Sequence, residues 1–286
     1  MRVGRIPYIN CYPVYGAIDR GIVPLDGRLI DGVPTELNRR MADGTLDVSV
    51  ISAVEYAHDA RKFVLLPDVS ISCDGPVRSV VLFAKRPAAE LNGRRVLVSR
   101  SSMTSVALVE LLFEHVWGAT PAFMPANAEL VDVASFGEEE HDARLVIGDA
   151  ALHLWSRLRS PEDYPNDNAP SEYRYAYDLG AEWKQWTGLP FVFAVWVAQR
   201  TAPVDKALRV HASLIESRNW GLQHLGTLAA QAAIATGVHK PVCLEYLSGL
   251  DYGLSYEHLA GLTEFFRRLV AAGRVPNGSL SFLPAA

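Results

Sequence analysis

The chain has 286 residues, of which 49% are hydrophobic and 21% are charged, and its formal net charge is −5. A chain of this length usually divides into lobes, because a single hydrophobic core stops growing at about this size. The mild negative charge argues against nucleic acid as a partner. Such a partner needs a basic face, and the longest basic runs here are pairs such as Arg39-Arg40.

The sequence indicates neither a membrane segment nor a metal site. No stretch approaches the roughly 18 consecutive apolar residues of a membrane-spanning helix. The chain begins without the apolar run of a secretion signal, so we expect a cytoplasmic protein. Its three cysteines, Cys11, Cys73 and Cys243, form no C-x-x-C pair, and the eight histidines show no metal-ligand spacing. The oligomeric state stays open, with a homodimer among the alternatives.

Short strands alternate with helices in the first third of the chain. The predicted strands cover residues 2–6, 28–32 and 46–51, followed by extended pieces at 64–67 and 69–72. The predicted helices cover residues 14–20 and 35–41, and a third begins near residue 52. Strands and helices that alternate over short links are typical of a parallel sheet.

The same alternation begins again in the middle of the chain. The predicted strands there cover residues 78–84, 94–98, 145–147 and 191–198. Helices are predicted at 106–116 and from 148 onward, and residues 161–170 form a polar loop. The last part is helical, because apolar residues recur at helical spacing in 204–217, 226–236 and 256–272.

Two apolar strands, at 80–84 and 191–198, enclose the middle block. The simplest topology is an α/β protein in which a second lobe, residues 85–198, is inserted into a first lobe, residues 1–84 plus 199–286. The two enclosing strands would form the hinge. This is the two-lobed type II periplasmic-binding-protein-like fold, whose ligand lies in the cleft between the lobes, at the carboxyl ends of the strands.

A polar run from Ser99 to Ser105 separates a predicted strand from an apolar helix. If Thr104 and Ser105 open that helix, its first N–H groups are unpaired at the positive end of the helix dipole. These groups would bind a carboxylate or phosphate, and the hydroxyls of Ser102, Thr104 and Ser105 would add donors. The alternative is that these serines only cap the helix.

Other candidate binding residues also follow predicted strands. Gly148 allows a ligand close to the backbone, and Asp149 either binds a ligand hydroxyl or caps its helix. Ser52 and Glu55 take the equivalent place in the first lobe, where Glu55 alternatively favours the helix dipole.

Asn10, Arg78 and Ser79 complete the candidate site. Asn10 lies in the bend after the first strand and offers both a donor and an acceptor, unless it only forms the turn. Arg78 and Ser79 come just before a buried strand. Arg78 would then be a counter-charge for a ligand carboxylate, or a partner in a surface ion pair.

Five segments together resemble the chorismate dehydratase family of the futalosine route to menaquinone. They comprise residues 5–13 (RIPYINCYP), 73–79 (CDGPVRS), 101–105 (SSMTS), 147–151 (IGDAA) and 179–194 (LGAEWKQWTGLPFVFA). They occur in the family's order, and the resemblance extends over nearly the whole chain.

The resemblance implies a lyase that removes water from the small anionic substrate chorismate and forms 3-[(1-carboxyvinyl)oxy]benzoate. It implies catalytic roles for Asn10 and Ser79 and a carboxylate site at Ser102–Ser105. Neither a metal nor a cofactor is required, since loss of the C3 proton and C4 hydroxyl forms an aromatic ring. The proton acceptor stays open, because no His or Lys is clearly placed and the substrate's enolpyruvyl carboxylate is itself a candidate.

Three other functions are compatible with the sequence. One is the sister enzyme that releases 1,4-dihydroxy-6-naphthoate; it shares the fold but uses a His as base, and the Pro7-Tyr8-Ile9-Asn10 start favours the dehydratase. A non-catalytic solute-binding protein would need export. A ligand-sensing regulator would need a DNA-binding domain.

Overall fold

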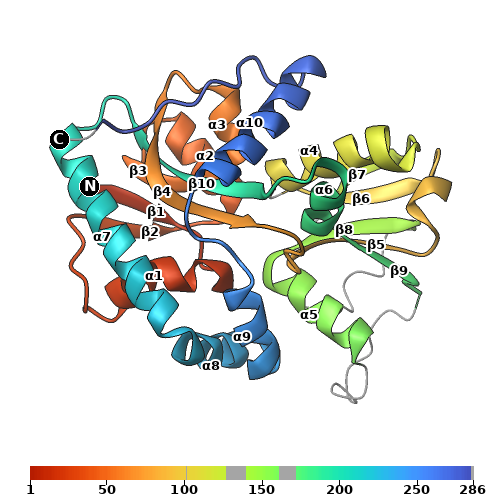
Figure 1. Cartoon of the computed structure of the whole chain (residues 1–286), viewed down its shortest axis with the longest axis horizontal. Helices are drawn as coiled ribbons and strands as arrows, with labels where there is room; N and C mark the ends of the chain where they lie inside the picture. Colours follow the sequence, from red (N-terminus) through yellow and green to blue (C-terminus); the bar gives the residue numbers. More distant parts are fainter. Residues whose placement is uncertain (101, 127–139, 161–171, 285–286) are drawn as a thin grey trace.

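Two five-stranded sheets form the framework of the molecule. The computed structural model describes residues 1–100, 102–126, 140–160 and 172–284 (Figure 1). The predicted loop at 161–170 and Ser101 therefore lie outside the described residues. Each sheet has helices packed against it, so the chain is an α/β protein with two lobes side by side.

The sheet of the first lobe has the strand order β2-β1-β3-β10-β4. Its strands are β1 (Arg2–Arg5), β2 (Arg28–Asp31), β3 (Val48–Ser52), β4 (Phe63–Cys73) and β10 (Phe191–Gln199). Strand β1 runs parallel to β2 and β3, and β10 runs antiparallel to β3 and β4. Every residue of β3 is buried, as expected for an interior strand covered on both faces.

The sheet of the second lobe has the strand order β7-β6-β8-β5-β9. Its strands are β5 (Val80–Ala84), β6 (Arg95–Ser99), β7 (Ala122–Ala126), β8 (Ala143–Ile147) and β9 (Tyr175–Asp178). Strand β6 is parallel to β7 and β8, whereas β5 is antiparallel to β8 and β9. Each sheet thus combines parallel strands with one antiparallel strand next to the edge strand.

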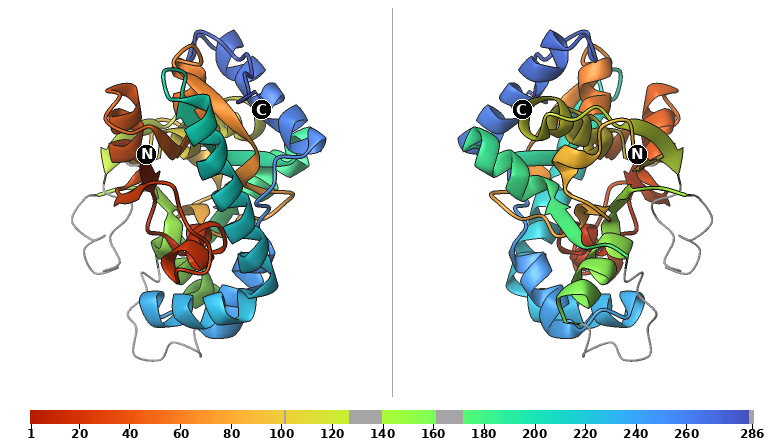
Figure 2. Two further views of the ribbon diagram at one scale, coloured as in Figure 1. Left: turned by 90° about the vertical axis from the view of Figure 1, so that its left-hand side faces the viewer. Right: turned by 90° about the vertical axis from the view of Figure 1, so that its right-hand side faces the viewer.

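Helices surround both sheets. The first lobe carries α1 (Tyr12–Asp19), α2 (Pro34–Ala42), α3 (Ala53–His58), α7 (Val204–Gln223), α8 (Leu225–Thr236), α9 (Lys240–Ser248) and α10 (Tyr256–Ala271). The second carries α4 (Met103–Leu112), α5 (Gly148–Arg159) and α6 (Leu179–Thr187). Short helical turns are η1 (Ile9–Cys11), η2 (Ala88–Glu90) and the π-turn η3 (Phe113–Trp117). The views agree that α8 and α9 lie at the opposite end of the molecule from α10 (Figure 2).

The chain passes between the two sheets at residues 74–79 and 188–190. Strand β5 belongs to the second sheet and β10 to the first. The sequence predicted lobes of residues 1–84 plus 199–286 and of residues 85–198. Those limits put β5 in the first lobe and β10 in the second, so each boundary requires correction by one strand. The cause is that apolar runs mark buried strands without indicating the sheet that each one joins. The hinge role of the two strands stays a prediction.

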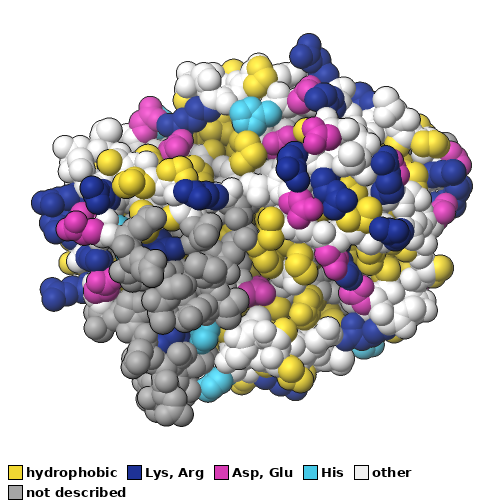
Figure 3. Space-filling view, turned by 180° about the vertical axis from the view of Figure 1, so that it is seen from behind, with side chains coloured by type: hydrophobic (Ala, Val, Ile, Leu, Met, Phe, Trp, Pro, Cys, Tyr) yellow, Lys and Arg dark blue, Asp and Glu magenta, His cyan; other side chains and the backbone are white. Residues whose placement is uncertain are grey.

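Oppositely charged side chains are interspersed on the face shown in Figure 3. Ion pairs among the described residues include those of Arg274 with Glu110 and Glu114, and that of Arg268 with Glu264. Among the described residues, no helix combines the length and the apolar character that crossing a bilayer requires.

Candidate functional site

A cavity of about 600 Å³, including its open mouth, lies where the carboxyl ends of the parallel strands of the two sheets face each other. Both lobes line it, and its floor is largely apolar. The hydroxyl and amide side chains in the lining are Tyr8, Asn10, Ser52, Ser79, Ser102 and Ser105. No Lys, Arg, His, Asp or Glu is among the described residues that line it.

Asn10 enters the cavity from the turn η1, directly after strand β1. The N–H of Cys11 donates to the Tyr8 carbonyl at 3.0 Å and closes this turn. The Oδ1 atom of Asn10 is buried and has no hydrogen-bond partner among the described residues. Because a buried amide oxygen is normally paired, this unpaired atom in a residue that lines the cavity makes Asn10 a candidate to accept from a bound molecule.

Ser79 enters the cavity from the segment that connects the two sheets. The carboxylate of Asp178 accepts hydrogen bonds from the N–H groups of Val77, at 3.0 Å, and Arg78, at 2.6 Å. Arg78 has a φ of 60°, an unfavourable value for a residue with a side chain. The Ser79 carbonyl then accepts from Gly148 N at 2.7 Å. The backbone on both sides of Ser79 is therefore held in place.

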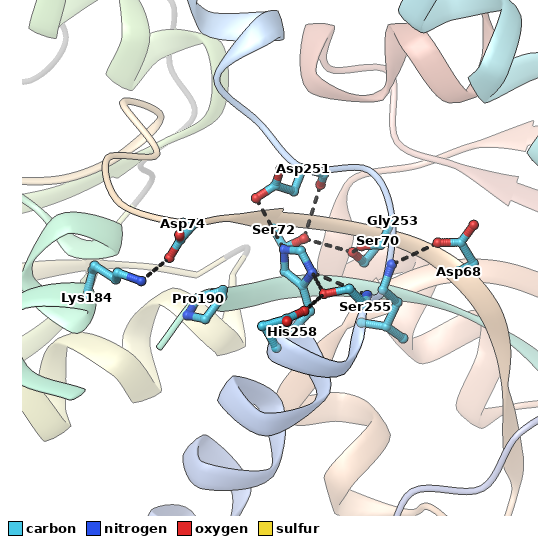
Figure 4. A network of polar contacts seen from close by, with 12 residues as sticks. Asp68, Ser70, Ser72, Asp74, Lys184, Pro190, Asp251, Gly253, Ser255 and His258 are labelled. Atoms are coloured by element: carbon cyan, nitrogen blue, oxygen red, sulfur yellow. Dashed lines mark hydrogen bonds and ion pairs between the residues drawn. The ribbon is translucent and has the colours of Figure 1, made fainter. Parts of the chain in front are cut away.

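A polar network anchors the strand that leads into this segment. Ser72 Oγ donates to the Asp251 carbonyl at 3.1 Å, and Ser70 Oγ donates to the Gly253 carbonyl at 2.5 Å (Figure 4). His258 lies beside this loop, with Nε2 at 3.2 Å from Asp251 Oδ2. Further along, Lys184 pairs with Asp74 (Figure 4). Chain segments distant in sequence thus stabilise the strand end before Ser79.

The start of helix α4 contributes Ser102 and Ser105. Ser102 is the N-cap and accepts from Ser105 N at 3.3 Å, and the two hydroxyls lie 2.7 Å apart. Ser102 therefore caps the helix as one of the two alternatives predicted, and both serines also line the cavity, while anion binding by this segment stays a prediction. Thr104 is buried outside the lining, where its Oγ1 accepts from Val54 N, at 3.3 Å, in the other lobe.

Ser52 ends strand β3 and lines the cavity from the first lobe. Asn38, which the sequence analysis missed, holds it: its Oδ1 accepts from Ser52 N at 3.1 Å, and its Nδ2 donates to Ser52 Oγ at 3.2 Å. A signal was present, because Asn38 shares the helix face of Pro34, Leu37 and Met41, all of them buried. A polar residue within such an apolar stripe is a reason to look for a specific partner.

Gly148 and Asp149 follow strand β8. Gly148 lines the cavity with a φ of 64°, and a side chain there would begin 3.4 Å from the Tyr8 ring. Asp149 lies outside the lining and does not cap its own helix; its Oδ1 accepts from Ile9 N, at 3.3 Å, in the other lobe. Burial raises the pKa of Asp149 to about 6, and the Ile9 N–H opposes this rise.

Two further candidates lie outside the lining. The Arg78 guanidinium donates to Glu245 Oε1 at 2.7 Å, so the structure favours the ion-pair alternative over a counter-charge for a ligand. Glu55 is half buried, which raises its pKa, but it is not among the lining residues. Cys11 does line the cavity, and burial raises its pKa, so the thiol stays protonated and is a poor nucleophile.

The described residues offer no metal site. Within the ranges that the structure covers, no three or more His, Cys, Asp or Glu side chains converge as metal ligands would. The polar side chains that line the cavity carry hydroxyls and the Asn10 amide, and helix α4 begins beside Ser102 in that lining. Such donors suit an anionic ligand with several oxygens.

Comparison with known proteins identifies the family. The profile of a family described as "Menaquinone biosynthesis" matches residues 1–271. The chain belongs to this family. A chorismate dehydratase from Thermus thermophilus is 34% identical over 271 residues, which cover 92% of this chain and 95% of that protein. A chorismate dehydratase from Campylobacter jejuni is 28% identical over 198 residues, 68% of this chain and 66% of that one. The predicted resemblance is thus confirmed.

Solved structures place this member of the menaquinone biosynthesis family among periplasmic-binding-protein folds. A Candida albicans protein described as having the generic periplasmic binding protein structural fold superposes with a TM-score of 0.62 at 12% identity, covering 100% of this chain and 98% of that one. The alkanesulfonate-binding protein SsuA from Xanthomonas axonopodis superposes with a TM-score of 0.66 at 12% identity, covering 98% of this chain and 95% of that one. The predicted two-lobed, periplasmic-binding-protein-like fold is therefore confirmed, although identity this low carries no information about the ligand.

Proposed function

We propose that this chain dehydrates chorismate to 3-[(1-carboxyvinyl)oxy]benzoate. The observation that carries the proposal is the meeting of Asn10 and Ser79 in one cavity that no acidic or basic side chain lines in the described residues. The names of the related dehydratases support the substrate. The sister reaction is disfavoured, because no histidine is among the described lining residues to act as its base.

The cavity holds the substrate through fixed hydrogen-bond donors. The Ser102 and Ser105 hydroxyls and the first N–H groups of α4 bind one substrate carboxylate. Ser52, oriented by Asn38, adds a donor from the first lobe. These donors stabilise charge that develops on the ring carboxylate when the C3 proton leaves, because that carboxylate is conjugated with C3 through a ring double bond.

Asn10 and Ser79 act on the other side of the ring. Asn10 offers an amide whose Oδ1 has no partner within the described residues, and it orients the C4 hydroxyl and the enolpyruvyl side chain. Ser79 donates to the C4 hydroxyl as its bond to the ring breaks. The C3–H electrons enter the ring, the C4–O bond breaks, and the hydroxide that leaves takes up the proton removed from C3, so that one molecule of water departs.

The substrate's own enolpyruvyl carboxylate takes the C3 proton. No titratable carboxylate or imidazole is among the described lining residues, and the nearby Asp149 faces Ile9 N. An Asp149→Asn variant distinguishes the two candidate bases, because it removes the Asp149 carboxylate while the new amide oxygen can still accept from Ile9 N. We expect its kcat to stay within about threefold of wild type, whereas loss of a general base costs about 100-fold or more.

The test is to add chorismate to the purified protein without metal or cofactor and to analyse the products by mass. A product lighter by one water, with a benzoate ultraviolet spectrum, supports the proposal. Asn10→Ala and Ser79→Ala should each lower kcat by about 100-fold, the usual cost of one transition-state donor. Ser213→Ala on the surface of α7, whose hydroxyl donates to the Pro24 carbonyl, is the matched control and should be normal.

Unchanged chorismate with wild-type protein would contradict the proposal. Normal turnover by both Asn10→Ala and Ser79→Ala would contradict the residue assignment instead. Location in the cytoplasm and the oligomeric state stay predictions.

A further inference from the structure

The turn that leads into Ser79 has a strained backbone. The Ser79 N–H donates to the Val77 carbonyl at 2.8 Å, which closes a three-residue γ-turn around Arg78. The φ of Arg78 is 60°, so this is the rare and strained form of the turn. Glycine would adopt this φ without strain, but the Arg78 guanidinium pairs with Glu245 of α9. Because strained residues persist only where their surroundings fix them, this turn requires a partner that holds it.

The carboxylate of Asp178 binds the backbone of this turn. Asp178 is the last residue of β9, lies opposite Val81 of the neighbouring strand β5, and is 5% exposed. Its Oδ2 accepts from Arg78 N at 2.6 Å. Its Oδ1 accepts from Val77 N at 3.0 Å and, as the N-cap of α6, from Ala181 N at 3.1 Å. One buried carboxylate thus holds the first two N–H groups of the turn and the start of a helix.

We propose that Asp178 is a positioning residue for Ser79: its carboxylate holds the strained turn that directs the Ser79 side chain into the cavity. Ser79 lines the cavity, whereas Asp178 is not among the described residues that line it, so Asp178 acts through the backbone. Beyond the turn, the Ser79 carbonyl accepts from Gly148 N at 2.7 Å, which fixes the other side. A catalytic side chain held in this way is aimed before substrate binds. This inference rests on the proposed function.

Asp178→Asn releases the turn and spares the helix. The amide oxygen can still accept from Val77 N and Ala181 N, which share Oδ1 in the wild type. The amide nitrogen then faces Arg78 N, and two donors cannot form a hydrogen bond. The cap of α6 is retained, because Asn caps a helix as well as Asp does. The variant therefore removes the bond to the strained residue selectively.

Steady-state kinetics with chorismate give the first test. Asp178→Asn should lower kcat by about 10- to 100-fold, the cost of a misplaced catalytic group. KM should change less than about twofold, because the proposed carboxylate donors, Ser102 and Ser105, belong to α4 and keep their own hydrogen bonds. Asp47→Asn is the matched control, since Asp47 also accepts from a backbone N–H, that of Arg2 at 2.7 Å, but lies just before β3. Its kcat should stay within about twofold of wild type.

A double-variant cycle distinguishes positioning of Ser79 from a general loss of structure. In a Ser79→Ala background, Asp178→Asn should change kcat less than about twofold, since the side chain that the turn directs is gone. A wild-type kcat in Asp178→Asn would overturn the proposal. So would an undiminished loss in the Ser79→Ala background, because it would show an effect independent of Ser79.

Amide hydrogen exchange tests the turn without any turnover. The Arg78 N–H should exchange slowly in the wild type, because it bonds to a buried carboxylate. In Asp178→Asn it should exchange at least about tenfold faster, the effect of one hydrogen bond to a charged group, while the Ala181 N–H stays protected by the cap. An Arg78 amide that exchanges equally fast in both proteins would overturn the proposal.

Two outcomes outside this scheme are also decisive. If Asp178→Asn did not fold, Asp178→Ser, whose hydroxyl still caps α6, should show the same loss of kcat, and a wild-type kcat there would overturn the proposal. If wild-type protein left chorismate unchanged, the proposed function would fail, while the exchange rates would still show whether Asp178 holds the turn.

Discussion

Asp149 makes the stability of this protein depend on pH in an unusual direction. Burial raises its pKa from 3.8 to about 6. Between these values the folded protein binds more protons than the unfolded chain, so the free energy of unfolding falls as pH rises. Each unit of difference between the folded and the unfolded pKa corresponds to about 1.4 kcal/mol. Through the Asp149 carboxyl, the free energy of unfolding therefore falls by about 3 kcal/mol between about pH 4 and pH 6.

Asp149→Asn isolates this contribution. The variant has no titrating group at the position, and its amide oxygen still accepts from Ile9 N. Urea unfolding of both proteins should be measured from pH 4 to pH 7. The difference in unfolding free energy, wild type minus variant, should become less favourable to wild type by about 3 kcal/mol across this range. All other titrating groups are common to both proteins and cancel in the difference.

Glu257→Gln provides a control of opposite sign. Glu257 is exposed, and a hydrogen bond from the Ser255 hydroxyl lowers its pKa. The Glu257 carboxylate stabilises the folded protein above its unfolded pKa, and this stabilisation is lost as pH falls through its folded pKa. The difference in unfolding free energy, wild type minus Glu257→Gln, should therefore rise with pH, opposite to that for Asp149→Asn. A difference for Asp149→Asn that stays constant between pH 4 and pH 7 would refute the assignment of a raised pKa to that buried carboxyl.

Two substitutions test the site and its surroundings. Ser105→Ala should raise KM for chorismate by about tenfold, since a hydrogen bond to a charged group is worth about 1.5–3 kcal/mol; steady-state kinetics check this, and an unchanged KM would argue against a carboxylate at α4. Gly180→Ala should destabilise the protein by about 1–3 kcal/mol, because the added carbon would lie 2.5 Å from the Gly75 carbonyl oxygen and 2.7 Å from Cys73 Sγ. Thermal unfolding would measure it, and an unaltered Tm would contradict the close packing.

The cavity residues that sequence reasoning found share one feature: each lies just beyond, or just before, a strand. Ser52 ends β3, Gly148 follows β8, and Ser79 precedes β5. Local sequence patterns reveal strand ends, and the rule that parallel strands present their carboxyl ends at one edge then brings these residues together. For this reason most of the hydroxyl and amide side chains in the lining could be predicted, all but that of Tyr8.

The residues that sequence reasoning missed act across long distances in sequence. Glu245 reaches Arg78, next to Ser79, from α9, whose start at Lys240-Pro241 lacks a strong amphipathic pattern. Helix α6 was also missed, because its N-cap, Asp178, is recognisable only from its hydrogen bonds. For Arg78 the sequence left a ligand carboxylate and a surface ion pair as alternatives, since its partner Glu245 lies 167 residues away. Pairings of this kind depend on tertiary structure, which periodicity does not encode.

The order of strands in the first sheet has a consequence for synthesis on the ribosome. Strand β4 pairs within its sheet with β10. More than a hundred residues separate the two strands in sequence, and they include the whole second sheet. The nascent first lobe must therefore wait with an apolar strand unpaired until β10 emerges, while the second lobe can already fold.

An unpaired apolar strand is a template for pairing with other chains. The interval before β10 emerges is thus the period when this protein is most exposed to aggregation, and chaperone binding to the growing chain would matter most there. A ribosome pause placed before β10 would lengthen that period, whereas one placed after it would not.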